Sequence, residues 1–389
     1  MGTSTTYSLA INSGSGRTRP TRRTARLGQL AAIGLLAGTL VGSAAPAQGS
    51  TFVVKGRGYG HGIGLSQYGA QGYALEGKKA NWIIRHYYTG VDVGDAPSRK
   101  IGVLLTGGGS AYSFSGARKA CDVATDPGST YGAVVSSGAV RLTRGGSTIA
   151  SCGSRFKAAG KGGIHLDGAG TYRGKLIFKR ASSGLNVINN LDLDAYLKGV
   201  VPAEAISSWE PAALQAQAIA ARSYALATSV NGDGYDVYDD VRSQVYNGKT
   251  VETDNTNAAV KATNGKAALY NGEVATTFFF STSGGRTESI ENAWPGSDPI
   301  PYLTSVKDEF DSISPVHTWS ETITGAELDA QLGDWVKGSL QAVRVDKKGD
   351  SGRIVYAEIV GTGGTTRVEG PDLRVRLGLR STWVRFERQ

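Results

Sequence analysis

The sequence predicts an α+β fold in which β-rich segments surround one buried, alanine-rich helix. Short apolar runs, separated by turns rich in Gly and Ser, fill residues 102–190, as is typical of strands. After Pro211, residues 212–228 contain neither Gly nor Pro and are rich in Ala, Leu and Gln, which favour a helix. Because strands and helices fall in separate segments rather than alternating, we do not expect βαβ units.

The remaining elements are predicted from local runs of the same kind. Small residues on the central helix, such as Ala218, Ala221 and Ala225, would let other segments pack closely against it. Two shorter helices are expected at 326–336 and 373–379. Strands are expected at 101–105, 139–143, 175–179, 185–189, 266–270, 271–283, 301–306, 342–348, 353–361, 365–370 and 382–387.

Residues 1–47 have the pattern of a secretory signal. Five arginines between Arg17 and Arg26 precede a mainly apolar run at 27–41, and Ala45-Pro46-Ala47 resembles a cleavage site. This run is shorter than the roughly 20 residues that a membrane span needs. We therefore expect a secreted or cell-wall protein with no stable membrane span after cleavage; an uncleaved anchor is the alternative.

The net charge argues against a nucleic-acid partner. The whole chain carries a formal charge of +9, and the five arginines of the signal account for five of these charges, leaving +4. That modest charge suits an anionic envelope surface, and neither a basic helix nor an RNA-binding motif is visible.

The chain has two cysteines, Cys121 and Cys152, and both lie in the predicted exported part. In an oxidising compartment we expect them to form a disulfide, worth about 3–4 kcal/mol in the chain-entropy model. Two free buried thiols are the alternative. No histidine lies at ligand spacing from either cysteine, so we expect no metal site there.

The stretch GRGYGHGIG places glycine at every second position from Gly56 to Gly64. In an extended chain one face of this stretch would be bare backbone, and His61 would lie on the other. A bare face would admit another backbone or a glycan very closely, and packing against the alanine-rich helix is an equal alternative. Ser66 is expected to cap a following helix, with Gln67 in its first turn.

Several of these stretches together resemble the SpoIID/LytB family, the stage II sporulation protein D type of peptidoglycan lytic transglycosylase. The resemblance covers most of residues 51–389 and implies cleavage of the β-1,4 bond between N-acetylmuramic acid and N-acetylglucosamine, with a 1,6-anhydro end and no cofactor. The stretches that carry it are 56–77, 83–90, 193–226, 243–248, 274–306, 351–361 and 373–386.

Two departures from the family pattern affect the predicted organisation. The GHG motif comes first here, so the chain looks permuted, and the strand around 383–388 should lie near the strand around 52–58. Tyr238 and Ser243 stand where the sporulation members carry zinc-site cysteines, so no structural zinc is expected. We predict a signal at 1–47, a GHG-motif segment with helices at 48–98, a SpoIID-like catalytic core at 99–317, and a C-terminal α+β segment at 318–389 that packs back on 48–98.

Glu204 is the predicted catalytic acid. Its neighbours at 200–206 are apolar, and burial would raise its pKa and keep the carboxyl protonated near neutrality. An exposed or capping glutamate is the alternative. One carboxyl suffices, because the 6-hydroxyl of the same muramic ring is the nucleophile, whereas ordinary glycoside hydrolysis needs two.

Other residues are predicted to line a substrate groove. Gln215 and Arg222 are seven residues apart and share a helix face. For Arg222, an ion pair with Asp192 or Asp194 is the alternative. The remaining candidates are polar or aromatic: Tyr224, His61, Gln67, Gln244, Tyr246, Ser283 and Trp294. For Tyr224, His61, Gln244 and Tyr246 a core or turn role is an equal alternative, and an isolated tryptophan such as Trp294 is more often a core residue.

The resemblance also implies partners. It implies glycan strands already stripped of stem peptides, so that a cell-wall amidase would act first. A non-catalytic amidase enhancer or wall-binding protein is the second interpretation. A muramidase that uses water and a second acid, such as Asp239 or Asp240, is the third.

Overall fold

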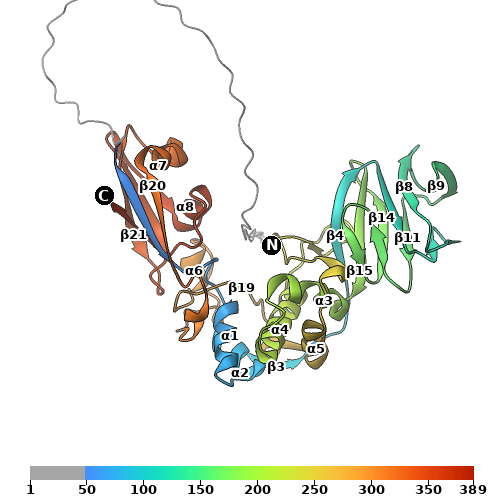
Figure 1. The fold of residues 1–389 in the computed structure, drawn as a ribbon, viewed down its shortest axis with the longest axis horizontal. Coiled ribbons are helices and arrows are strands. Elements are labelled where there is room, and N and C mark those ends of the chain that lie inside the picture. Colours follow the sequence, from blue (N-terminus) through green and yellow to red (C-terminus); the bar gives the residue numbers. More distant parts are fainter. Residues whose placement is uncertain (1–48) are drawn as a thin grey trace, which may run out of the picture.

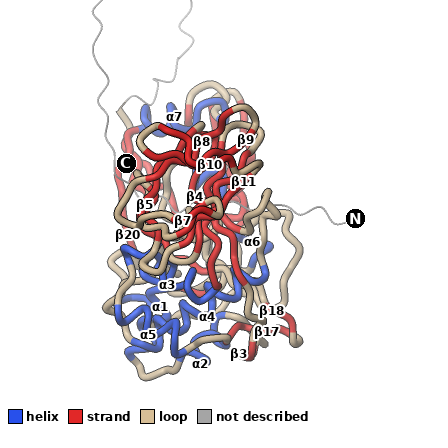
Figure 2. Tube along the Cα trace, turned by 90° about the vertical axis from the view of Figure 1, so that its right-hand side faces the viewer, coloured by secondary structure: helices blue, strands red, loops and turns tan. Residues whose placement is uncertain are grey.

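The computed structural model describes residues 49–389, so the predicted signal at 1–47 lies outside the described residues. The fold is α+β, as predicted, and consists of a central helical body flanked by two β-rich bodies (Figure 1). Figure 2 shows helices α1–α5 (Gln67–Leu75, Ala80–Tyr87, Leu193–Glu204, Pro211–Ala227 and Asp254–Ala262) together at one end of the molecule. In the part of the chain that the structure describes, no helix has the length and apolar character needed to cross a membrane.

The central helix α4 matches the predicted buried helix. It begins with Pro211, whose missing N–H costs nothing in a first helical turn. Ala216, Ala220 and Ala225 are fully buried, and helices α1, α2, α3 and α5 all contact α4. The small side chains of these alanines let the four helices approach α4 closely. Short elements complete this body: β2 (Leu65–Ser66) with β19 (Phe279–Phe280), β3 (Asp92–Asp95) with β17 (Lys266–Tyr270) and β18 (Glu273–Val274), and α6 (Ile290–Ala293).

The first β-rich body has two sheets. Phe114, Phe156 and Phe178 meet in its core, with ring centroids 4.8–6.1 Å apart. Cys121 and Cys152 form a disulfide with Cα atoms 5.7 Å apart. The strands of one sheet run in the order β16 (Val237–Tyr238), β4 (Lys100–Gly109), β15 (Leu185–Asp192), β14 (Lys175–Arg180), β11 (Arg155–Ala159), β6 (Lys119–Ala120) and β7 (Val123–Ala124). Those of the other run β10 (Ser147–Ser151), β9 (Ala139–Arg144), β8 (Tyr131–Ser136), β5 (Ala111–Ser115), β12 (Ile164–Leu166) and β13 (Gly170–Tyr172).

The second β-rich body brings the two ends of the described chain together. Strand β1 (Thr51–Arg57) pairs antiparallel with β24 (Val384–Arg388) on one side and with β20 (Thr318–Thr324) on the other. This confirms that the strand at 383–388 lies beside the one at 52–58; the domain boundaries stay a prediction. The body has its own apolar core. Its other elements are α7 (Gly325–Leu332), β21 (Leu340–Lys348), β22 (Ile354–Gly361), β23 (Gly364–Glu369) and α8 (Gly370–Arg376).

Two predicted strands are largely irregular. Only Glu273–Val274 and Phe279–Phe280 are strands within 271–283, and 301–306 contains none. Some of the backbone there bonds to side chains instead of a neighbouring strand, for example from Thr276 N to the hydroxyl of Tyr302 at 3.1 Å. The predicted helix at 326–336 also ends early, at Leu332, because Gly333 adopts a φ of +55°.

Candidate functional site

Glu204 is the last residue of α3, and its side chain faces a small pocket between α3, α4 and two loops. The carboxyl Oε1 accepts a hydrogen bond of 2.9 Å from the backbone N–H of Val245. The amide of Gln67, in the first turn of α1, also hydrogen-bonds to the carboxyl. The pocket is lined by Glu204, Tyr224, Val241, Ser243, Gln244, Phe278 and Phe279.

Burial dominates the electrostatics of Glu204. Removal from water disfavours the charged form and raises the pKa of the carboxyl from 4.5 to about 7, against the opposing effect of the donors from Val245 and Gln67. Near neutral pH, protonated and ionised forms of Glu204 are therefore both populated. That is the condition under which one carboxyl can give a proton and then take one back.

Two glutamines near this carboxyl, Gln244 in the pocket lining and Gln217 bonded to Gln67, each have a buried polar atom with no hydrogen-bond partner. Gln217 accepts a weak bond of 3.4 Å from Gln67, but its own Nε2 is unpaired. Gln244 donates to the carbonyl of Ala221 at 3.1 Å, while its Oε1 is unpaired. Such atoms are costly to bury, and they are common where a ligand or water completes the bonding. Gln217 cannot be singled out from the sequence, because the Ala- and Gln-rich pattern of α4 marks it only as a helix former.

The cavity that Glu204 lines is much smaller than a sugar ring in this conformation. The cavity beside the carboxyl is about 10 Å³, which is room for about one water molecule. Val241, from the loop after β16, and Phe279, in β19, are among the residues that line it. A sugar-sized groove at Glu204 stays a prediction, and a glycan could reach the carboxyl of this pocket only after a movement of the residues that line it.

Of the other predicted site residues, Tyr224 and Gln244 line the pocket with Glu204. Burial raises the pKa of the Tyr224 hydroxyl to about 12, so it is neutral at physiological pH. Gln215 is half-buried on α4 and is not among the lining residues. Tyr246 is buried, and its hydroxyl donates to Asn189 Oδ1 at 2.7 Å, which makes its observed role a core contact.

Arg222 forms the internal ion pair that was the alternative to substrate binding. Its guanidinium is buried and donates to Asp194 Oδ1 from both Nε and Nη2, at 3.0 and 2.6 Å. The remaining nitrogen, Nη1, donates to the carbonyl of Lys266 at 2.9 Å. With all three nitrogens engaged away from the Glu204 pocket, Arg222 holds α4 to α3 in this conformation.

His61, Ser283 and Trp294 lie in the packed layer behind the pocket. The ring of His61 contacts those of Phe278 and Trp294, with centroids 6.2 and 5.4 Å apart. Its Nδ1 accepts from the N–H of Ile63, and its Nε2 lies 3.1 Å from the carbonyl of Phe279, so Nε2 carries the proton. Burial lowers the pKa of His61 to about 3. Ser283 is buried and donates to Asp311 at 2.8 Å.

The alternating glycines pack against protein. The segment leaves the extended conformation after Arg57, since Gly58 to Gly64 have positive φ at every second residue. A Cβ at Gly60 would lie 2.7 Å from Phe280 Cβ, and one at Gly64 would lie 2.2 Å from the carbonyl oxygen of Phe278. The bare face thus meets another stretch of backbone, the 278–283 segment, as the first interpretation expected, and neither a glycan nor the alanine-rich helix α4 occupies it. Ser66 caps α1, accepting from the N–H of Gly69 at 3.2 Å, as predicted.

Among residues 49–389, no group of three His, Cys, Asp or Glu side chains is arranged to hold a metal ion. Tyr238 and Ser243, at the positions compared with zinc ligands, are instead joined by a hydrogen bond of 3.1 Å from the Tyr238 N–H to the Ser243 hydroxyl.

Comparison with known proteins finds a family match for part of this chain. Residues 181–270, which contain Glu204, Tyr224 and Gln244, match the family model described as SpoIID, Stage II sporulation protein. Stage II sporulation protein D of Bacillus subtilis (strain 168) is 32% identical over 218 residues, which are 52% of this chain and 62% of that protein. The protein named amidase enhancer from the same organism is 40% identical over 143 residues, 37% of this chain and 19% of that protein.

An uncharacterized protein of Brachyspira hyodysenteriae is 34% identical over 176 residues, 44% of this chain and 47% of its own length. The chain thus spans less than two thirds of each of these relatives. The family model matches the region that carries Glu204, Tyr224 and Gln244 of the pocket. Residues 181–270 thus match the SpoIID family, and the chain is similar to relatives named stage II sporulation protein D and amidase enhancer.

Proposed function

We propose that this protein is an exported lytic transglycosylase that cleaves peptidoglycan glycan strands, with Glu204 as its acid and base. The observation that supports this most directly is the carboxyl of Glu204, whose pKa burial raises to about 7 beside polar atoms that lack partners. A cell-wall role fits the family, and the specific reaction is our inference.

In the proposed reaction the protonated Glu204 donates to O4 of N-acetylglucosamine as the bond from that oxygen to C1 of N-acetylmuramic acid breaks. The 6-hydroxyl of the same muramic ring forms a bond to C1, and the ionised carboxyl takes the proton of that hydroxyl. The proton count balances, water is not consumed, and the product carries a 1,6-anhydro ring. The amide of Gln67 would stabilise the ionised form between the two transfers.

Substrate binding requires the closed pocket to open. Val241, Ser243 and Gln244 line the pocket, and the N–H of the following residue, Val245, donates to the carboxyl. The 239–247 segment is therefore the part that a glycan would displace. A displaced segment would release Gln244, whose unpaired Oε1 could then accept from a sugar hydroxyl or acetamido N–H. We propose peptide-stripped glycan as the substrate, because stem peptides would add bulk at an already narrow site.

A non-catalytic role as an amidase enhancer is the second candidate. It is favoured by the name of the relative that is 40% identical to this chain and by the closed state of the pocket. In that role the protein would bind the wall and increase the activity of a separate amidase without cutting glycan itself.

Product analysis separates these functions. Peptide-stripped glycan is incubated with the mature protein and with Glu204→Gln, and the products are examined by mass spectrometry. Anhydromuramic ends from the wild type and none from the variant would support the proposal. Reducing ends would instead indicate a water-using muramidase, for which Asp239, with its pKa raised to about 6 by burial, is the residue to replace next. No cleavage by either protein, with stimulation of an added amidase, would overturn the transglycosylase proposal in favour of the enhancer.

A further inference from the structure

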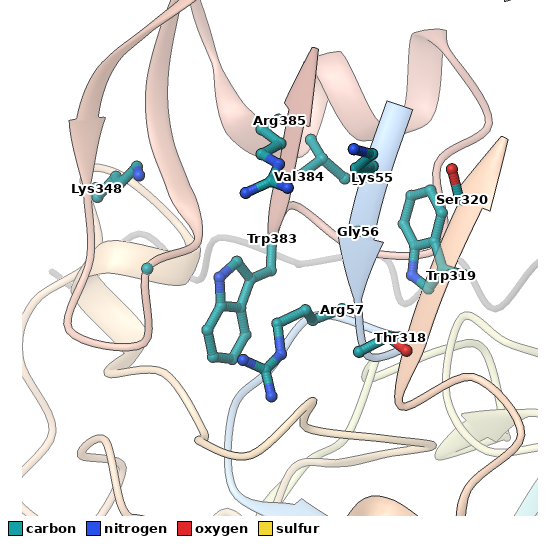
Figure 3. Close-up of a pocket in the computed structure, with 11 residues that line it drawn as sticks. Lys55, Gly56, Arg57, Thr318, Trp319, Ser320, Lys348, Trp383, Val384 and Arg385 are labelled. Carbon is teal, nitrogen blue, oxygen red and sulfur yellow. The ribbon is translucent and has the colours of Figure 1, made fainter. Parts of the chain in front are cut away.

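A second and much larger cavity lies on the three-stranded sheet of β20, β1 and β24 (Figure 3). Its volume is about 700 Å³, within the usual range of small-molecule and saccharide sites. None of its lining residues belongs to the Glu204 pocket. They are Lys55, Gly56, Arg57, Thr318, Trp319, Ser320, Lys348, Gly352, Trp383, Val384 and Arg385.

The lining is strongly basic. It contains four cations and no carboxylate. Glu387, outside the lining, bonds both Lys55 and Arg385 at 2.7 Å, so one carboxylate offsets two of these charges. Among the described residues Lys348 has no ion pair, and the polar partner of the Arg57 guanidinium is the ring nitrogen of His317 at 3.1 Å. Positive charge in excess of its counter-charges favours an anionic ligand.

The lining also presents two indole rings. Trp319 is held rigidly, because its Nε1 donates to the carbonyl of Gly58 at 2.9 Å and its ring lies across Gly56. Trp383 has the Arg57 guanidinium over its ring, 4.9 Å from the centroid. Flat, half-buried rings beside cations match the two sides of an acidic sugar, whose C–H face is apolar and whose substituent is charged.

Glycine is required at two positions of the cavity wall. A Cβ at Gly56 would lie 2.2 Å from the ring of Trp319. Gly352, at a φ of +93°, allows its turn to pass beside Trp383, where a Cβ would lie 3.0 Å from the indole nitrogen. The rings are therefore seated against backbone on one side, and this arrangement supports their orientation toward the cavity that Figure 3 shows.

We propose that this cavity binds an acidic saccharide, a pyranose that carries a carboxylate or a phosphate. Two wall polymers offer that chemistry: peptide-free glycan, whose muramic residues carry lactyl carboxylates, and phosphate-linked polymers substituted with sugars. The proposal is independent of the reaction at Glu204, and it holds equally for an enzyme and for an enhancer. It assigns this body of the protein a wall-anchoring role at a site separate from the Glu204 pocket.

The test measures binding by isothermal titration calorimetry with three probes on the mature chain carrying Glu204→Gln, so that no probe is cleaved. The probes are chitotetraose, a peptide-free tetrasaccharide of alternating N-acetylglucosamine and N-acetylmuramic acid, and an oligomeric glycerol phosphate substituted with N-acetylglucosamine. At least one acidic probe should bind more tightly than the neutral chitotetraose. The acidic probe that binds more tightly shows which of the two wall polymers this cavity recognises.

The decisive variant is Lys348→Glu, which reverses an exposed charge that has no ion pair and should therefore fold normally. At low ionic strength this substitution should lower the affinity for the acidic probe about five- to tenfold. The estimate takes the change from +1 to −1 as two units of charge, acting on the anion across about 7 Å of water. Lys261→Glu on α5 is the matched control, an equal charge change outside the cavity lining, and should alter the affinity less than twofold.

Trp383→Leu, checked for folding by circular dichroism, should also lower the affinity for the acidic saccharide. Equal affinity for neutral and acidic probes, or equal effects of Lys348→Glu and Lys261→Glu, would overturn the proposal. Neither result would bear on whether the wild type forms anhydromuramic ends. The binding proposal for this cavity can therefore be overturned while the proposed reaction at Glu204 stands, and the reverse is also true.

Discussion

Replacing Glu204 by glutamine should stabilise the protein above pH 7, and the gain should vanish toward pH 4. The folded state holds the Glu204 proton more tightly than the unfolded chain does, because burial raises the pKa of this carboxyl from 4.5 to about 7. Stability falls with rising pH wherever the folded state binds more protons than the unfolded state. Wild-type protein therefore loses stability between about pH 4.5 and pH 7, whereas glutamine, which does not titrate, carries no such loss.

The size of this effect follows from the pKa shift. Each pKa unit corresponds to about 1.4 kcal/mol, and the displacement from 4.5 to about 7 would give about 3 kcal/mol for a group fully removed from solvent. Glu204 keeps partial contact with solvent, which screens the interaction, so we expect about 2–3 kcal/mol. This is a substantial share of the 5–15 kcal/mol that typical domains possess.

Urea unfolding of the wild type and of Glu204→Gln at pH 4.5, 6 and 8 measures the difference in unfolding free energy. Asp308, whose pKa burial also raises to about 7, is present in both proteins, so its titration cancels in the difference. Glu273→Gln, at an exposed position on β18, controls for the loss of any one carboxylate. A stability difference that stays flat from pH 4.5 to 8, or that favours the wild type at pH 8, would refute the claim that Glu204 is buried at an energetic cost.

Three further predictions test neighbouring parts of the structure. Arg222→Met should lower the free energy of unfolding by about 2–4 kcal/mol, since it leaves Asp194 without its buried partner; lost glycan cleavage with unchanged urea unfolding would instead indicate a role in substrate binding. Gly56→Ala should cost about 1–3 kcal/mol and change the near-ultraviolet circular dichroism of Trp319, whose ring occupies the space of the new methyl group. The imidazole of His61 should show no titration by NMR between pH 5 and 8, because its pKa is about 3; a midpoint near 6.5 would contradict its burial.

The sequence predicts best where local pattern and burial agree. The 17-residue helix α4 has strong helix formers throughout, and its alanines predict the close packing that the structure shows. The pairing of β1 with β24 could be predicted from the order of the stretches that resemble the SpoIID/LytB family. A permuted chain that keeps its fold must bring its two ends together. The apolar residues around Glu204 likewise predict the direction of its pKa shift.

The same reasoning fails where distant segments decide the structure. Residues 275–278 have the composition of a strand, yet they lack a neighbouring strand to complete a ladder. The width of the Glu204 pocket depends on Val241, in a loop, and on Phe279, in β19, which both follow α4 in the chain. For Arg222, the sequence leaves an ion pair and a substrate contact equally open, and tertiary packing decides between them.

The 56–67 segment shows why glycine alternates in this protein. Its backbone N–H groups donate in turn to separate parts of the fold: Gly58 to the carbonyl of His317, Tyr59 to that of Thr282, and Gly60 to that of Arg380. A chain that bonds to successive neighbours at such close range has no room for a Cβ on the contact side, which accounts for the alternation without any glycan. The segment begins at the wall of the basic cavity and ends at Gln67, which contacts Glu204, so the two candidate sites lie at opposite ends of one tightly packed length of backbone.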